Sequence, residues 1–163
     1  MLSLLYNKIK RNYDMLHSNY PILYAGNTFN FELYLLRQAE QELRVGKPRV
    51  WTKIADIYAK QLTIISINPY PEAETTITIF GSDEIPPSLK HIIYNTNYHN
   101  FYRWGIKGER TGNHRIIYAI HNYHKVILLH YFDKQYNGLI KQKNILPAEE
   151  NYAIYCKNDP TLY

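Results

Sequence analysis

The sequence lacks the paired cysteines that cross-link secreted domains and the long apolar run that crosses a membrane. Cys156 is the single cysteine among 163 residues, so no internal disulfide can form. The longest apolar run, residues 62–67, is far shorter than the roughly 20 residues of a membrane span. The apolar N-terminus meets Lys8, Lys10 and Arg11 too early for a secretion signal. We therefore expect a cytoplasmic protein with no membrane segment.

Several chemistries also lack their sequence signatures. The glycines between residues 105 and 112 do not form the loop with Lys-Ser/Thr that cradles nucleotide phosphates, and neither H-E-x-x-H nor G-x-S-x-G occurs. His121 and His124 have H-x-x-H spacing, but two histidines without a third ligand are weak evidence for zinc. The sequence predicts no metal and no cofactor.

The charge of the chain is distributed unevenly. Residues 1–84 hold nine Lys and Arg and nine Asp and Glu, whereas residues 85–163 hold ten Lys and Arg and five Asp and Glu. The second half therefore carries the whole net charge of +5, and six of the seven histidines as well. A basic half favours an anionic partner, either nucleic acid or an acidic protein, although a solvated basic surface would look the same.

Apolar spacing of three and four residues predicts helices in the N-terminal part. We expect helices at residues 2–17, 28–45 and 50–62, with a connection at 18–27. The β-branched residues 63–67 and the segment 75–80 predict two strands that pair as a hairpin. Residues 88–94 fit either a helical turn or an edge strand.

The clearest pattern begins near residue 100. Short loops separate three strand-like segments at residues 101–107, 114–120 and 125–132, which predicts an antiparallel meander. Pro147 suits the first turn of a helix that ends near Lys157. The whole chain, 1–163, is read as one α+β domain: a small antiparallel sheet packed against N-terminal helices and a C-terminal helix, with 1–27 as a helical extension.

Side-chain alternation places cations beside aromatic rings on one face of this meander. Arg103 and Lys107 share a face of the first strand, and on the second strand Arg115 lies opposite to His114. The alternation on the third strand groups Leu128, His130 and Phe132. Guanidinium and ammonium groups neutralise phosphates and rings stack on unpaired bases, so this face suits RNA.

Such a face would support RNA cleavage without a metal. Arg115 would stabilise the charge that builds on the phosphate oxygens, and His130, His114 or Tyr136 would transfer protons. Each has a simpler alternative. Arg115 could pair with a carboxylate such as Glu109 or Asp133, and His130 could be a core histidine. The basic residues Lys107 and Arg110 flank a glycine loop and could simply be solvated.

Two motifs of the meander resemble those of a known family. His114 to Ile120 reads His-Arg-Ile-Ile-Tyr-Ala-Ile, and Leu128 to Gln135 reads Leu-Leu-His-Tyr-Phe-Asp-Lys-Gln. This order resembles the RelE/ParE toxins, and the second motif resembles the HigB-like branch. The likeness covers residues 99–157. It leaves an insertion at 63–98 within the 28–163 core, and Gln135 stands where the branch has a second lysine.

The resemblance implies the toxin of a type II toxin–antitoxin system, a ribosome-dependent mRNA endoribonuclease that a cognate antitoxin neutralises. It implies catalytic positions at Arg115, Lys134, His130 and Lys107. We add Arg103, Arg110, His114 and Tyr136 as RNA-binding residues. Two alternatives stay open: a non-enzymatic ParE-like toxin that binds a protein such as DNA gyrase, and an inert nucleic-acid-binding module of the same fold.

Overall fold

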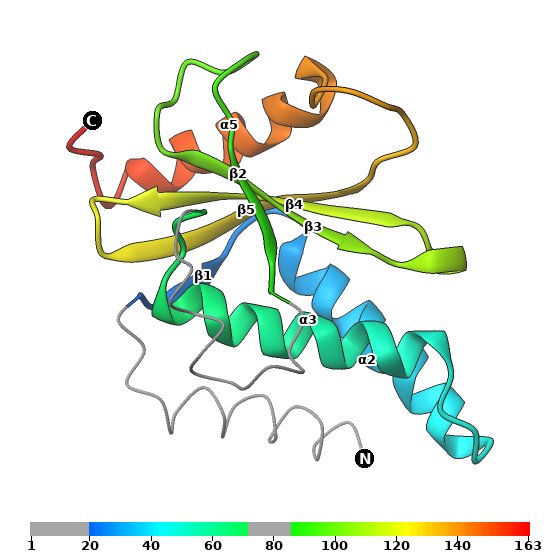
Figure 1. The fold of residues 1–163 in the computed structure, drawn as a ribbon. Helices are drawn as coiled ribbons and strands as arrows, with labels where there is room; N and C mark the ends of the chain where they lie inside the picture. The colour runs from blue at the N-terminus through cyan, green and yellow to red at the C-terminus, as the bar shows by residue number, and fades with distance from the viewer. Residues whose placement is uncertain (1–19, 72–85) are drawn as a thin grey trace.

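The computed structural model describes residues 20–71 and 86–163 (Figure 1). Five strands form one sheet in the order β1-β5-β4-β3-β2. The strands are β1 (Ile22–Tyr24), β2 (Ser88–His91), β3 (Phe101–Lys107), β4 (Asn113–His121) and β5 (Lys125–Asp133). The helices are α2 (Thr28–Arg44), α3 (Val50–Ile67) and α5 (Gln142–Cys156), with a 3-10 turn, η2 (Glu109–Thr111). The predicted α+β class is confirmed.

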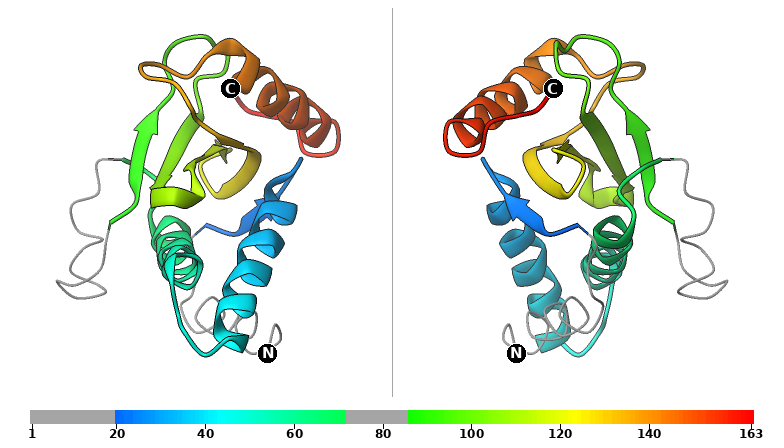
Figure 2. Two further views of the ribbon diagram at one scale, coloured as in Figure 1. Left: turned by 90° about the vertical axis from the view of Figure 1, so that its right-hand side faces the viewer. Right: turned by 90° about the vertical axis from the view of Figure 1, so that its left-hand side faces the viewer.

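Helices α2 and α3 cover one face of the sheet (Figure 2). Their apolar stripes bury large side chains such as Phe31, Ile54 and Tyr58 against Trp104 and Tyr118 of the strands. Burial of each such side chain stabilises the fold by roughly 1.5–3 kcal/mol before strain and entropy are counted. This face is therefore a closed apolar core.

Helix α5 covers only part of the opposite face. Its buried residues Ile145, Ala148 and Tyr152 follow a helical spacing and pack on Ile117 and Ile127. The helix contacts mainly β5 and β4. The part of this face that β3 and β2 contribute lies to the side of the helix, and the candidate site is found there.

The strand predictions for the meander hold, and the N-terminal predictions need two corrections. The three predicted strands are β3, β4 and β5, and the edge-strand alternative for 88–94 is borne out by β2. Residues 63–67, predicted as a strand, are the end of α3. Ile64 and Ile65 are almost fully buried there, and this packing outweighs the weak helix propensity of β-branched residues. The segments predicted at 2–17 and 75–80 lie outside the described residues.

The second correction concerns the expected connection at 18–27. It contains β1, which pairs with β5 in parallel, so the sheet is mixed and not purely antiparallel. Three residues are too few to show a strand period.

Pro147 lies inside α5, which begins at Gln142, and not in its first turn.

A bulge changes the expected faces of β5. Register shifts between Ile117, which opposes His130, and Tyr118, which opposes Leu128. Leu128 consequently packs under α2 and α3, whereas Phe132 packs on the α5 face. The predicted grouping of Leu128 with His130 and Phe132 is wrong, because one extra residue reverses the alternation.

Candidate functional site

Arg115 lies on the α5 face of β4, at the uncovered part of the sheet. It opposes Gly105 of β3 and Phe132 of β5. A Cβ atom at Gly105 would come within 3.1 Å of the Arg115 guanidinium carbon, so glycine leaves the room in which the guanidinium lies across β3. Nη1 donates to Oδ1 of Asn113 at 2.6 Å and to the carbonyl oxygen of His114 at 2.8 Å.

Arg103 and Lys134 lie near this guanidinium, and Lys90 lies beside Arg103. Arg103 is on the same face of β3, and Lys90 of β2 is directly opposite it. Lys134 follows β5 and donates from Nζ to the carbonyl oxygen of Gly138 at 2.6 Å. We call Lys90, Arg103, Arg115 and Lys134 the cationic cluster.

None of the four residues of the cationic cluster forms an ion pair within the described part of the protein. Burial lowers the pKa of Arg115, and the nearby Arg103 lowers it further. Burial lowers the pKa of Lys134 too, followed by the charges of Arg115 and Arg103. Like charges held this close destabilise the unliganded fold, so an anion at this place would relieve a cost.

Arg115 also keeps one donor unused. Its side chain is 9% exposed, and its buried Nε has no hydrogen-bond partner among the described residues. The alternative in which Arg115 pairs with Glu109 does not hold, since Glu109 binds Nζ of Lys53 at 2.7 Å. Asp133 is near enough to offset part of the shift of the Arg115 pKa, but its oxygens accept from the Asn113 backbone and the Gln135 amide. A buried donor without a partner costs about 1–3 kcal/mol, so the fold holds Arg115 in this place at an energetic cost.

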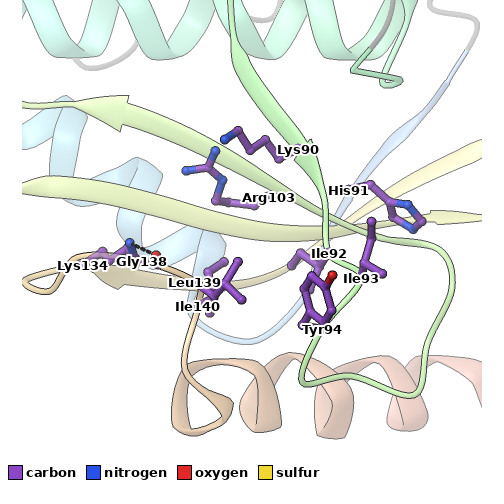
Figure 3. Close-up of a pocket in the computed structure, with 10 residues that line it drawn as sticks. All are labelled: Lys90, His91, Ile92, Ile93, Tyr94, Arg103, Lys134, Gly138, Leu139 and Ile140. Atoms are coloured by element: carbon purple, nitrogen blue, oxygen red, sulfur yellow. Dashed lines mark hydrogen bonds between the residues drawn. The ribbon is translucent and has the colours of Figure 1, made fainter.

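A cavity of about 430 Å³ adjoins the cationic cluster (Figure 3). One wall is basic and consists of Lys90, Arg103 and Lys134. The other wall is apolar and consists of Ile92, Ile93, Tyr94, Leu139 and Ile140. His91 also borders the cavity, but its ring stacks on Tyr102 with centroids 4.8 Å apart.

His130 and Tyr136 stand beside the cluster. His130 is on the strand next to Arg115, one diagonal step from it, and its ring stacks on Phe132 with centroids 5.8 Å apart. Burial lowers the pKa of His130, so the ring is neutral at pH 7. The Tyr136 ring is close to two ammonium groups, with its centroid 4.9 Å from Nζ of Lys134 and 4.7 Å from Nζ of Lys141. The half-buried His130 is thus able to accept a proton.

Three predicted residues are not brought into the cluster. His114 is 2% exposed on the opposite face, where Nδ1 is 2.9 Å from the Tyr131 hydroxyl and Nε2 is 2.9 Å from Oγ1 of Thr111. Arg110 lies in η2 and borders a separate shallow cavity at the start of α3. Lys107 is on the same face of the sheet as Arg115, but it is exposed at the end of β3. We assign His114 to the core and leave Arg110 and Lys107 outside the site.

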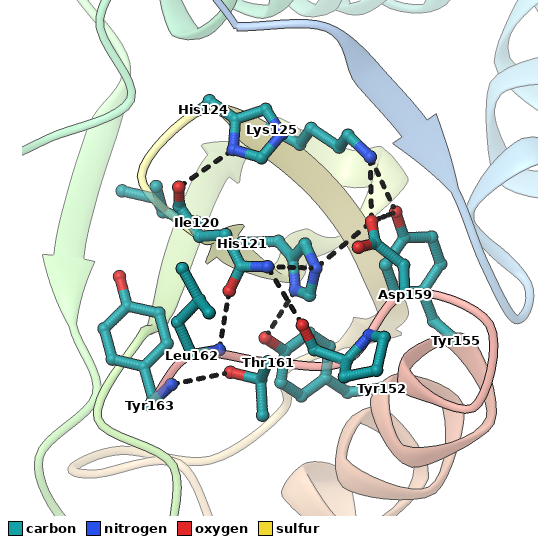
Figure 4. Close-up of polar contacts among 12 residues, drawn as sticks. Ile120, His121, His124, Lys125, Tyr152, Tyr155, Asp159, Thr161, Leu162 and Tyr163 are labelled. Atoms are coloured by element: carbon teal, nitrogen blue, oxygen red, sulfur yellow. Dashed lines mark hydrogen bonds and ion pairs between the residues drawn. The ribbon is translucent and has the colours of Figure 1, made fainter.

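A second polar cluster lies on the same face at the other end of β4 and β5 (Figure 4). Asp159 accepts from Nζ of Lys125 at 2.8 Å and from the Tyr155 hydroxyl at 2.6 Å, and its oxygen is 3.2 Å from Nε2 of His121. The first two bonds hold the pKa of Asp159 well below its ordinary value. Nδ1 of His121 is 2.8 Å from the Tyr152 hydroxyl. We call these five residues the Asp159 cluster; it fastens the C-terminal segment to the sheet.

The H-x-x-H pair does not converge. His121 belongs to the Asp159 cluster, while Nδ1 of His124 contacts the carbonyl oxygen of Asn122 at 2.8 Å. Over residues 20–71 and 86–163, no three His, Cys, Asp or Glu side chains gather as a metal ion would require. The helices of these same ranges include none with the length and apolar run needed to cross a bilayer.

Sequence reasoning missed the second wall of the cavity and Lys90. Alternation within a strand at 88–91 would have placed Lys90 with Arg103, but the sequence of that segment fits a helical turn as well as an edge strand. Leu139 and Tyr94 lie in loops, where no periodicity indicates which side chains meet.

No protein-family model, no curated protein and no solved structure matches this chain. Support for a function therefore comes from the geometry of the cationic cluster and the cavity beside it.

Proposed function

We propose that this protein is an endoribonuclease toxin that cleaves mRNA on the ribosome, with the cationic cluster as its phosphate site. The observation that carries the proposal is the convergence of Arg103, Arg115 and Lys134 beside a cavity without a carboxylate paired to any of them. Cations that repel one another in the free protein are matched by a phosphodiester, whose charge grows in the transition state.

The chemistry uses the RNA's own nucleophile. The 2′-oxygen attacks the adjacent phosphorus, the bond from phosphorus to the 5′-oxygen breaks, and the products carry a 2′,3′-cyclic phosphate and a 5′-hydroxyl. His130 takes the proton of the 2′-hydroxyl because its lowered pKa keeps it neutral. Lys134, whose pKa is also lowered, gives a proton to the departing 5′-oxygen. Arg115 and Arg103 stay charged and hold the non-bridging oxygens.

The partners follow from the same charges. Single-stranded mRNA presented by a ribosome in the cytoplasm supplies an unpaired, anionic substrate. A cognate antitoxin would neutralise the protein by placing acidic side chains over the cationic cluster. Because Arg103 and Lys90 lie on the edge side of the sheet, a partner could cover them without displacing α5.

The test is a cleavage assay on end-labelled mRNA, with and without translating ribosomes, using the parent and Arg115→Ala. We expect discrete cuts by the parent and none by the folded variant. Cuts that need ribosomes place the activity on translated mRNA. Equal cutting by both proteins would remove Arg115 from the site. Intact RNA in every reaction, from protein that still arrests growth, would favour a toxin that binds a protein target.

A further inference from the structure

The apolar wall of the cavity has no part in the cleavage step. Ile93, Tyr94 and Leu139 are 68%, 63% and 64% exposed, although all three are large and apolar. They project from two neighbouring loops that border the cavity, as Figure 3 shows. Ile92 and Ile140 beneath them are buried. Single exposed apolar residues are common, but three at one cavity indicate a binding surface.

The two loops are held in place before any ligand arrives. Nδ2 of Asn95 donates to the carbonyl oxygen of Ile140 at 3.0 Å and so joins one loop to the other. Asn95 has a φ of 64°, a left-handed conformation that asparagine tolerates better than most residues. Thr96 donates to Glu149 of α5 at 2.7 Å. A preformed wall loses little conformational entropy when it binds.

A ligand that fits must carry an anion and a flat apolar surface side by side. A nucleotide within single-stranded RNA has both, since its phosphate and its base are adjoining groups. The exposed Tyr94 ring offers a stacking surface for a base, with Ile93 and Leu139 on either side. The volume of about 430 Å³ lies in the range of small-ligand sites.

We propose that this cavity is a base-binding subsite, which seats the nucleobase next to the phosphate held by the cationic cluster. The inference rests on the proposed function, because it takes RNA as the ligand. It assigns recognition of the substrate to residues 92–94 and 138–140, which lie outside the strands that carry the phosphate site.

The test compares two fluorescent ligands of equal charge and length. One is a short single-stranded RNA with 2′-O-methyl groups, which cannot be cleaved, and the other is the same backbone without bases. Parent protein should bind the base-containing strand roughly 5- to 100-fold more tightly, the range for stacking one base. Tyr94→Leu should lose most of this preference and Tyr94→Phe should keep it. Tyr123→Leu is the matched control, because Tyr123 is also 63% exposed but lies in the β4–β5 turn.

The outcomes separate this inference from the proposed function. Full base preference in both Tyr94→Leu and Leu139→Ala would overturn the subsite. Equal affinity of the parent for both strands would also overturn it and would fit an acidic peptide as the occupant. The phosphate site would survive either result if Arg115→Ala weakened binding of both strands. A base preference that depends on Tyr94, in a protein that never cuts RNA, would support the subsite and contradict the nuclease.

Discussion

Two lysines of the same sheet face, at the two ends of β5, have opposite surroundings. Lys125 pairs with Asp159, and this bond raises the pKa of Lys125. Lys134 donates to a carbonyl oxygen, and burial, together with the charges of Arg115 and Arg103, lowers its pKa. In the Asp159 cluster the charged side chains pair with one another. In the cationic cluster the basic side chains form no ion pair with the described residues, so a ligand can supply the negative charge. We infer that the Asp159 cluster has a structural role and that the cationic cluster has a functional one.

The largest expected effect comes from replacing one basic residue of each cluster with alanine. Arg115→Ala should lower the rate of RNA cleavage about 100- to 1000-fold, the usual loss when one donor to a developing oxyanion is removed. Lys125→Ala should leave that rate within about twofold, because Lys125 lies at the far end of the sheet. Single-turnover cleavage measures both. A loss of activity in Lys125→Ala, still folded by circular dichroism, would break the comparison.

The proton-transfer role of His130 predicts a particular pH profile. Burial lowers its pKa, so the neutral, proton-accepting form persists below pH 6.5 and the cleavage rate falls only as the pH drops through that lowered pKa. His130→Gln should slow cleavage about 100-fold and abolish this acidic limb. A limb that stays in His130→Gln would assign the proton acceptor to another group.

A substitution in the Asp159 cluster should lower the stability of the protein and leave its cleavage activity unchanged. Tyr152→Phe removes the hydroxyl that accepts from Asn100 at 2.8 Å and meets His121, both of which are buried. We expect the free energy of unfolding to fall by about 1–3 kcal/mol, the cost of orphaned buried groups, with cleavage unchanged. Urea unfolding measures the loss, and Tyr34→Phe, whose ring is half exposed, serves as the control.

The smallest expected effect is on the salt dependence of RNA binding. Each phosphate contact adds about 0.7 to the slope of log affinity against log salt for a single strand. Lys134→Ala should reduce the slope by about that amount, and Lys125→Ala should not change it. An equal reduction in both variants would mean that the whole basic face binds RNA diffusely.

The part of the site on consecutive strands could be predicted from the sequence, and the part on loops could not. Strict alternation in β3 and β4 indicates which side chains share a face within each strand, and the observed register brings the faces of Arg103 and Arg115 together. The sequence also indicates His130 as a candidate, but the face neighbours predicted for it are wrong, since a bulge leaves no mark in the sequence pattern.

The same limit explains the fold. Helix α2 has the predicted length because its apolar stripe ends where Gly46 adopts a left-handed φ. The C-terminal part of α3 reads as a strand in isolation, and only its burial against the sheet makes it helical. Tyr94 and Leu139 line the same cavity because the Asn95 to Ile140 bond joins their loops, a contact across 45 residues that no local pattern encodes.

The most direct test of the central claim is a crystal structure with the uncleavable 2′-O-methyl RNA bound. The account predicts a phosphate whose oxygens lie within hydrogen-bond distance of the Arg103 and Arg115 guanidinium groups, beside the cavity. A phosphate seated instead at Arg49 and Arg110, beside the shallow second cavity, would contradict it.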